Sequence, residues 1–180
     1  MLHGFGIIFL LSGAICALSD FLTFKIPNQI LLFLIVLFII YAALFLPIQE
    51  IYNHLIPAGV ALIIGFILYA AKVIGAGDAK FITVCMLWIT PSNIPTFILV
   101  TAIAGAVLAL IYLFLENHII KLKESCLKKI EAYSWGKSYL QDRITPPKLG
   151  ADRIGKGLIP YGVAVFAGIL FTSILTKGNF

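Results

Sequence analysis

Two aspartates are the residues of this sequence most suited to chemistry. Asp20 ends the first long apolar run, and Asp78 begins the fourth, directly after Gly75 and Gly77. A carboxylate within a membrane helix costs at least about 2.5–3.5 kcal/mol at its centre, so each needs a reason. Two carboxylates brought together from different helices would share a proton, one accepting a proton from water and the other donating to a scissile carbonyl. This pattern indicates aspartyl proteolysis.

Each aspartate also has a purely structural interpretation. Asp78, after a glycine turn, could serve only as the N-cap of a helix, with Lys80 as its ion partner. Asp20 could mark the membrane interface at the end of a span, paired with Lys25. These roles are compatible with catalysis, so the residues alone leave both interpretations open.

Other catalytic chemistries lack a set of candidate residues. The cysteines form no C-x-x-C pair, the histidines fall in separate segments, and no G-x-S-x-G elbow occurs with a nearby histidine. The cysteines and histidines are Cys16, Cys85, Cys126, His3, His54 and His118. We therefore predict that the protein uses no metal ion and no cofactor.

The elements that must position the two aspartates are membrane helices. The sequence is 61% hydrophobic with a mean hydropathy of +1.06, and its apolar residues form long runs. Crossing about 30 Å of hydrocarbon takes about 20 predominantly apolar residues. The sequence therefore predicts an all-α polytopic membrane protein with about six transmembrane helices. The predicted spans are Phe5 to Ser19, Asn28 to Leu46, Ile56 to Ala71, Asp78 to Thr90, Pro95 to Leu115 and Leu158 to Thr176.

The distribution of basic residues predicts the orientation of these spans. Residues 116–156 hold nine of the thirteen lysines and arginines, and such residues collect in cytoplasmic loops. This rule puts the N-terminus outside and both aspartates on the cytoplasmic side of the cell (inner) membrane. The net charge of +5 is thereby explained by topology, and we predict no nucleic-acid partner.

We predict a single membrane domain over residues 1–180, with 116–156 as a basic cytoplasmic loop facing anionic lipid. Leu122, Cys126, Ile130 and Tyr133 recur at helical spacing, which favours an amphipathic surface helix over a solvated connector. The fourth span is short, with about 13 residues covering about 20 Å, which predicts that Asp78 lies below the inner surface.

Three motifs give the sequence a resemblance to a known family. They are Asp20 followed by Lys25-Ile26-Pro27-Asn28, then Gly75-Ala76-Gly77-Asp78-Ala79-Lys80, and finally Ile159-Pro160-Tyr161-Gly162. In this order the chain resembles the type IV prepilin peptidases, which are membrane aspartyl proteases with a G-x-G-D motif. The resemblance implies that Asp20 and Asp78 are the catalytic pair. It also implies supporting motif residues, which are Gly75, Gly77, Lys80, Lys25, Pro27, Asn28, Pro160 and Gly162.

The resemblance also implies a substrate, a prepilin or pseudopilin precursor cut on the cytoplasmic side between its short basic leader and its hydrophobic helix. Larger family members carry a zinc-binding insertion between the first two spans and methylate the new N-terminus. This chain lacks room for that insertion, so we predict cleavage without methylation. Its short form is most similar to the minimal peptidases of Tad-type (Flp) pilus systems.

Two other functions remain alternatives. A small proton-coupled transporter would also use carboxylates within the membrane, but both aspartates are predicted on one side and the sequence has no internal repeat. A non-catalytic assembly subunit would use them only as caps. The sequence does not predict the oligomeric state.

Overall fold

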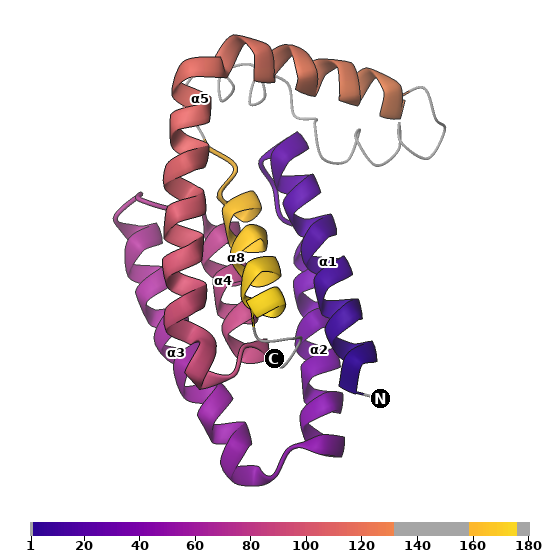
Figure 1. Ribbon diagram of the computed structural model, residues 1–180, viewed down its shortest axis with the longest axis vertical. Coiled ribbons are helices and arrows are strands. Elements are labelled where there is room, and N and C mark those ends of the chain that lie inside the picture. Colours follow the sequence, from indigo (N-terminus) through magenta and orange to yellow (C-terminus); the bar gives the residue numbers. More distant parts are fainter. Residues whose placement is uncertain (1, 132–158, 176–180) are drawn as a thin grey trace.

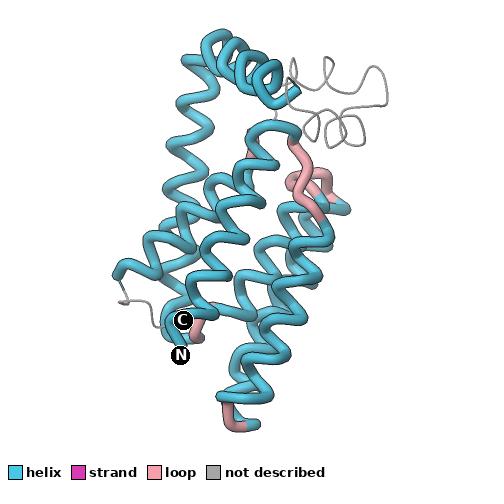
Figure 2. The backbone as a smooth tube through the Cα atoms, turned by 90° about the vertical axis from the view of Figure 1, so that its right-hand side faces the viewer, coloured by secondary structure: helices cyan, strands magenta, loops and turns pink. Residues whose placement is uncertain are grey.

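The protein folds into a bundle of α-helices (Figure 1). A computed structural model describes residues 2–131 and 159–175, which contain no β-strand. The helices are α1 (Leu2–Thr23), α2 (Asn28–Phe45), α3 (Ile48–Ala70), α4 (Ala76–Trp88), the short 3-10 helix η1 (Pro91–Asn93), α5 (Ile94–Glu131) and α8 (Tyr161–Leu175). Short loops join most of these helices (Figure 2). The prediction of an all-α fold is confirmed.

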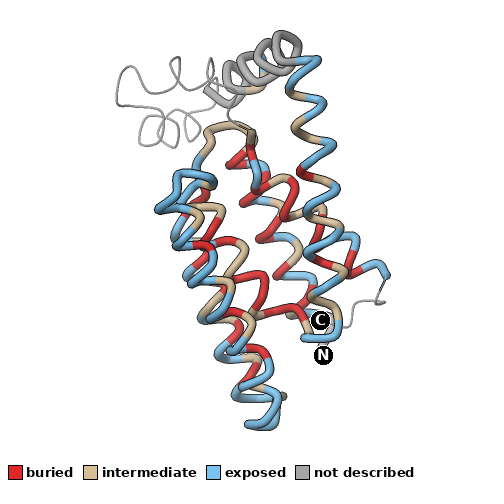
Figure 3. Tube along the Cα trace, turned by 90° about the vertical axis from the view of Figure 1, so that its left-hand side faces the viewer, coloured by how far each residue is buried: buried red, intermediate tan, exposed pale blue. Residues whose placement is uncertain are grey.

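The outer surface of this bundle is apolar, as expected for a protein surrounded by lipid. Buried residues line the interior while exposed residues face outward along the helices (Figure 3). The exposed side chains include Phe66, Ile67, Leu113 and Phe114. Four segments in the described part of the chain are long and apolar enough to cross a membrane, namely Gly4–Thr23, Asn28–Phe45, Ile48–Ala70 and Pro91–Leu115. The chain is therefore a polytopic membrane protein.

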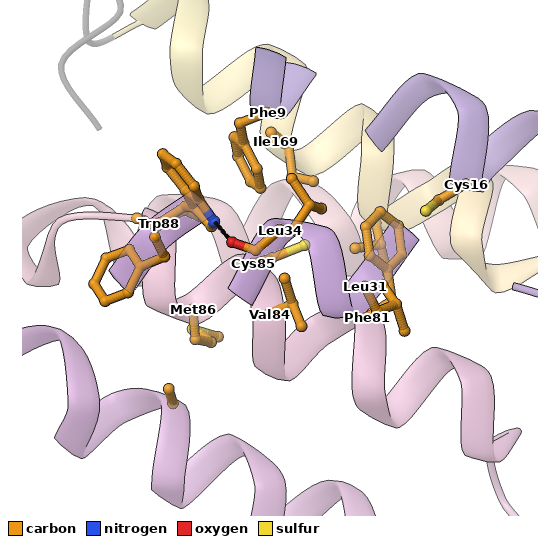
Figure 4. Close-up of a cluster of buried hydrophobic side chains, with 14 of the residues drawn as sticks. Phe9, Cys16, Leu31, Leu34, Phe81, Val84, Cys85, Met86, Trp88 and Ile169 are labelled. Carbon is orange, nitrogen blue, oxygen red and sulfur yellow. Dashed lines mark hydrogen bonds between the residues drawn. The ribbon is translucent and has the colours of Figure 1, made fainter. Parts of the chain in front are cut away.

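Helix α4 is the centre of the bundle, packing against α2, α3 and α8. Its last residue, Trp88, stacks on Phe9 of α1 with ring centroids 5.1 Å apart. The Trp88 indole N–H donates to the carbonyl oxygen of Leu34 in α2 (3.3 Å; Figure 4). A buried aromatic ring with a satisfied donor holds a helix end firmly. The C-terminal end of α4 is therefore fixed to α1 and α2.

Several helix boundaries differ from the prediction. Helix α1 continues to Thr23, so Asp20 lies in its last turn rather than at its end. Helix α3 begins at Ile48, well before the predicted Ile56, and Pro57 lies inside it instead of near its start. A proline within a membrane helix is tolerated because neighbouring helices and local adjustments satisfy the freed backbone groups.

Helix α5 is longer than its predicted span. It continues past Leu115 to Glu131, and the backbone at Leu115 is non-helical (φ −119°, ψ 18°), which marks a kink. Beyond the kink the helix turns across the end of the bundle (Figure 1). Residues 132–156 of the predicted basic loop, Tyr133 among them, lie outside the described residues.

Helices α1 and α3 are each followed by a residue with left-handed backbone. These residues are Phe24 (φ 53°) and Lys72 (φ 60°). Such a conformation costs a non-glycine residue of order 1–3 kcal/mol. It allows the chain to turn sharply at the end of a helix. The ends of α1 and α3 thereby meet the starts of α2, α4 and α8 at one end of the bundle (Figure 1). We call it the pocket end, because it contains the pocket described in the next subsection.

Helices α5 and α8 approach closely at Gly168. A Cβ atom placed on Gly168 would overlap the Thr101 hydroxyl and lie 3.1 Å from the Phe97 ring. We therefore expect Gly168→Ala to destabilise the protein by roughly 1–3 kcal/mol, because overpacking forces neighbours out of position. Thermal unfolding in detergent measures this loss. Gly59→Ala is the control, because no atom lies within 4 Å of its added Cβ; equal unfolding temperatures for the two variants would contradict the expected close packing.

Candidate active site

Asp20 is held by the backbone of a helix distant in the sequence. Its side chain is only 5% exposed, and its Oδ2 accepts a hydrogen bond from the Gly162 N–H at 2.7 Å. Gly162 is the second residue of α8, where N–H groups lack partners within the helix. The positive end of the helix dipole favours a carboxylate at this position. The Ile-Pro-Tyr-Gly motif thus begins the helix whose N-terminus orients Asp20.

Asp78 lies in the first turn of α4, but it is not the N-cap. The N-cap is Gly75, and Asp78 is the third residue of the helix. The Asp78 carboxylate reaches back to a hydrogen bond with the Gly75 backbone, as acidic residues do at this position of a capping box. A Cβ atom on Gly75 would lie 2.9 Å from Asp78 Oδ2, so glycine leaves room for this arrangement. Asp78 therefore caps α4 from the third helical position, and the alternative interpretation of it as the N-cap residue is wrong.

The two carboxylates share one pocket at the pocket end of the bundle. The pocket has a volume of about 470 Å³, and Asp20 and Asp78 interact electrostatically. Its lining comes from the end of α1, the loop to α2, and the starts of α2 and α4. The lining residues are Asp20, Phe24, Lys25, Ile26, Asn28, Gly75, Ala76, Gly77, Asp78 and Lys80. Residues from two motifs that are about 50 positions apart in the sequence therefore meet in space.

The polar residues of the two motifs contact each other beside the carboxylates. The Lys80 ammonium donates to Asn28 Oδ1 at 3.4 Å, and no ion pair joins it to Asp78 among the described residues. The structural alternative that pairs Lys80 with Asp78 therefore does not describe the contact that Lys80 makes. Pro27 is the N-cap of α2, and Gly77 faces Ile26 at ordinary contact distance, 3.5 Å from a Cβ placed on the glycine. These contacts hold the start of α4 against the start of α2.

Tyr112 of α5 does not line the pocket, but it is a neighbour of Asp20 that the sequence did not reveal. Its phenol oxygen is buried and the side chain interacts electrostatically with Asp20. In the sequence Tyr112 is one aromatic residue in a long apolar run, where nothing distinguishes it from a residue facing lipid. Only the packing of α5 beside α1 and α8 brings it towards the carboxylate.

The arrangement suits acid–base chemistry on a molecule that enters the pocket. Two carboxylates that line one pocket repel each other when both are ionised, and this repulsion favours protonation of one of them. Such a pair holds an acid and a base side by side. Fold and site together define a polytopic helical membrane protein with two carboxylates at the ends of two of its helices.

Comparison with known proteins identifies the family. The chain belongs to the type IV leader peptidase family, whose family model matches residues 7–110. The match includes both aspartates and ends before α8. Searches among curated proteins and among solved structures gave no significant match. The resemblance to the prepilin peptidases is confirmed, and the chain is a leader peptidase-like protease.

Proposed function

We propose that the protein is a membrane aspartyl endopeptidase that removes the short basic leader from prepilin or pseudopilin precursors at the cytoplasmic face of the membrane. Asp20 and Asp78 are its catalytic pair. The observation that carries this proposal is that both carboxylates line one pocket and interact electrostatically. Membership of the type IV leader peptidase family supports the substrate class.

The reaction follows from the shared proton. The ionised carboxylate takes a proton from a water molecule as the water oxygen bonds to the scissile carbonyl carbon, and the protonated carboxyl gives its proton to the carbonyl oxygen. The resulting diol collapses as one of its hydroxyl groups gives its proton to the ionised carboxylate and the carbon–nitrogen bond breaks. The leaving nitrogen takes a proton from the pair and departs as an amine, which leaves the carboxylates sharing one proton again.

The arrangement of charges supports cleavage on the cytoplasmic side. Lys25, Lys72 and Lys80 all follow or begin helices at the pocket end, and basic residues favour the cytoplasmic face. A precursor whose leader stays in the cytoplasm would present its scissile bond at this depth. The pocket and the substrate would then meet at the same membrane surface.

The connection between α1 and α2 supports cleavage without methylation. Only residues 24–27 separate the two helices. The cysteine-containing insertion of the larger enzymes has no counterpart in this short loop. We therefore expect the product to carry an unmodified N-terminal amine.

The proposal is tested with purified protein in liposomes and a prepilin precursor that retains its leader. The expected result is a single cut between leader and hydrophobic helix, unaffected by a metal chelator, with the new N-terminus and its mass determined by mass spectrometry. Failure to cut any pilin-like precursor, together with aspartate-dependent proton flux in the same liposomes, would favour the transporter instead.

Tyr112→Phe tests the contribution of the phenol to the site. Because the phenol dipole lies near the Asp20 charge, its removal is expected to slow cleavage roughly 3- to 10-fold, the order of one hydrogen-bond-sized interaction. The expected change is in kcat, measured with the same precursor at several pH values. A rate and a pH profile identical to those of the unchanged protein would remove Tyr112 from the site.

A further inference from the structure

Phe24 lines the pocket in a conformation that phenylalanine rarely adopts. Its φ of 53° lies in the left-handed region, where an aromatic residue is a conformational outlier. Phe24 follows the last residue of α1, and its N–H donates to the Asp20 carbonyl at 2.8 Å. Glycine is the usual residue at this position after a helix. The protein therefore keeps a phenylalanine where glycine would be easier to accommodate.

The surrounding hydrogen bonds hold Phe24 in this conformation. The hydroxyl of buried Ser19 donates to the Lys25 carbonyl at 2.9 Å. The Thr23 hydroxyl donates to the Ser19 carbonyl at 2.8 Å and lies 3.5 Å from the same Lys25 carbonyl. Strained residues that neighbours hold in place in this way concentrate at functional sites. The turn directs both Phe24 and Lys25 to the pocket that contains the two aspartates.

Lys72 has the same backbone conformation as Phe24 but lies outside the pocket. It follows α3 with a φ of 60°, and the N–H groups of Lys72 and Val73 donate to the carbonyls of Tyr69 and Leu68. These two hydrogen bonds form a Schellman motif, the standard end of a helix. Lys72 is exposed and does not line the pocket. Phe24 and Lys72 thus share a backbone role and differ in whether they face the pocket.

Phe24 is followed in the chain by Lys25, which disfavours a basic segment of substrate beside the aromatic ring. Lys25 and Lys80 line the same pocket, and their ammonium groups repel a basic leader. The peptide on the other side of the scissile bond is apolar, because the hydrophobic helix of the precursor begins there. An aromatic ring favours an apolar neighbour through burial of surface from water.

We propose that Phe24 is a specificity-determining residue that contacts the apolar residues following the scissile bond. This inference rests on the proposed function and adds to it the position of the substrate within the pocket. The basic leader then leaves the pocket on the side away from Lys25 and Lys80.

The kinetic test compares Phe24→Gly, Phe24→Tyr and the matched control Lys72→Gly. Phe24→Gly is expected to raise KM roughly 10-fold while kcat stays within about 2-fold, as loss of one apolar contact does. Phe24→Tyr keeps the ring and should keep KM. Lys72→Gly relieves the same backbone strain and should raise the unfolding temperature with cleavage unchanged. The proposal would be overturned if Phe24→Gly left KM unchanged. A Phe24→Gly variant that lowered only kcat and the unfolding temperature would be one such case.

Photocrosslinking provides a readout that does not depend on cleavage. A benzophenone amino acid replaces Phe24, or Lys72 as the control, in a chain that also carries Asp78→Asn. Capture of the precursor at position 24 on its hydrophobic-helix side, with none at position 72, is the expected result. Two results would overturn this inference, provided that the protein without these substitutions cleaves the precursor: capture on the basic leader, or no capture at position 24. Neither result would contradict the proposed function. If position 24 captures the hydrophobic-helix side but the protein without these substitutions never cleaves the precursor, the proposed catalysis alone is contradicted.

Discussion

Asp20→Asn and Asp78→Asn are each expected to lower cleavage of a prepilin precursor by roughly 10²- to 10⁴-fold, the usual contribution of a positioned acid or base. Asparagine has almost the same shape as aspartate but can neither accept nor donate the shared proton. Both single variants should lose activity to a similar extent, because an acid without its base performs no complete step. The measurement is the initial rate of leader removal in liposomes.

The control for this prediction is the folded state of each variant. Asp20 is buried and accepts a hydrogen bond from Gly162, so a neutral amide at position 20 could weaken the start of α8. Unfolding temperature and elution as a single species in detergent separate that effect from lost catalysis. A well-folded variant that cleaves at the original rate would exclude its aspartate from the pair and leave only the structural interpretation of that residue.

The sequence identified both aspartates because a carboxylate in an apolar run is visible without a structure. Asp20 and Asp78 each interrupt such a run, and each lies in one of the three motifs that carry the family resemblance. The spacing could not predict that they meet, because that depends on the packing of α4 between α2 and α3. The structure provides this step by placing both in one pocket.

The start of α3 was misjudged because polar residues there lower the hydropathy. Glu50, Asn53 and His54 interrupt the apolar pattern, and Pro57 resembles a helix start. In the structure the segment is helical from Ile48, and His54 is buried against the ring of Phe38. Tertiary packing thus allows helix where local hydropathy predicts a loop.

The role of Gly162 could not be read from the sequence either, since its N–H binds a carboxylate 142 positions away. We expect Gly162→Ala to lower kcat/KM by about 10²-fold, because misplacing a catalytic group by about 1 Å costs this much. The added Cβ would lie 2.9 Å from Asp20 Oδ2, 3.0 Å from its Cβ and 3.1 Å from its Cγ. The loss should appear mainly in kcat, because Gly162 does not line the pocket.

Two further alanine variants distinguish a displaced carboxylate from a general disturbance. Gly59→Ala adds a Cβ into open space and should cleave at the original rate. Gly75→Ala brings a Cβ near Asp78 Oδ2 and Cγ, and that half-buried carboxylate has the pocket to move into. Its loss of activity should therefore be smaller than that of Gly162→Ala, which meets the whole buried side chain of Asp20. If Gly162→Ala cleaves as fast as Gly59→Ala, the N-terminus of α8 does not set the position of Asp20, and the third motif contributes to folding alone.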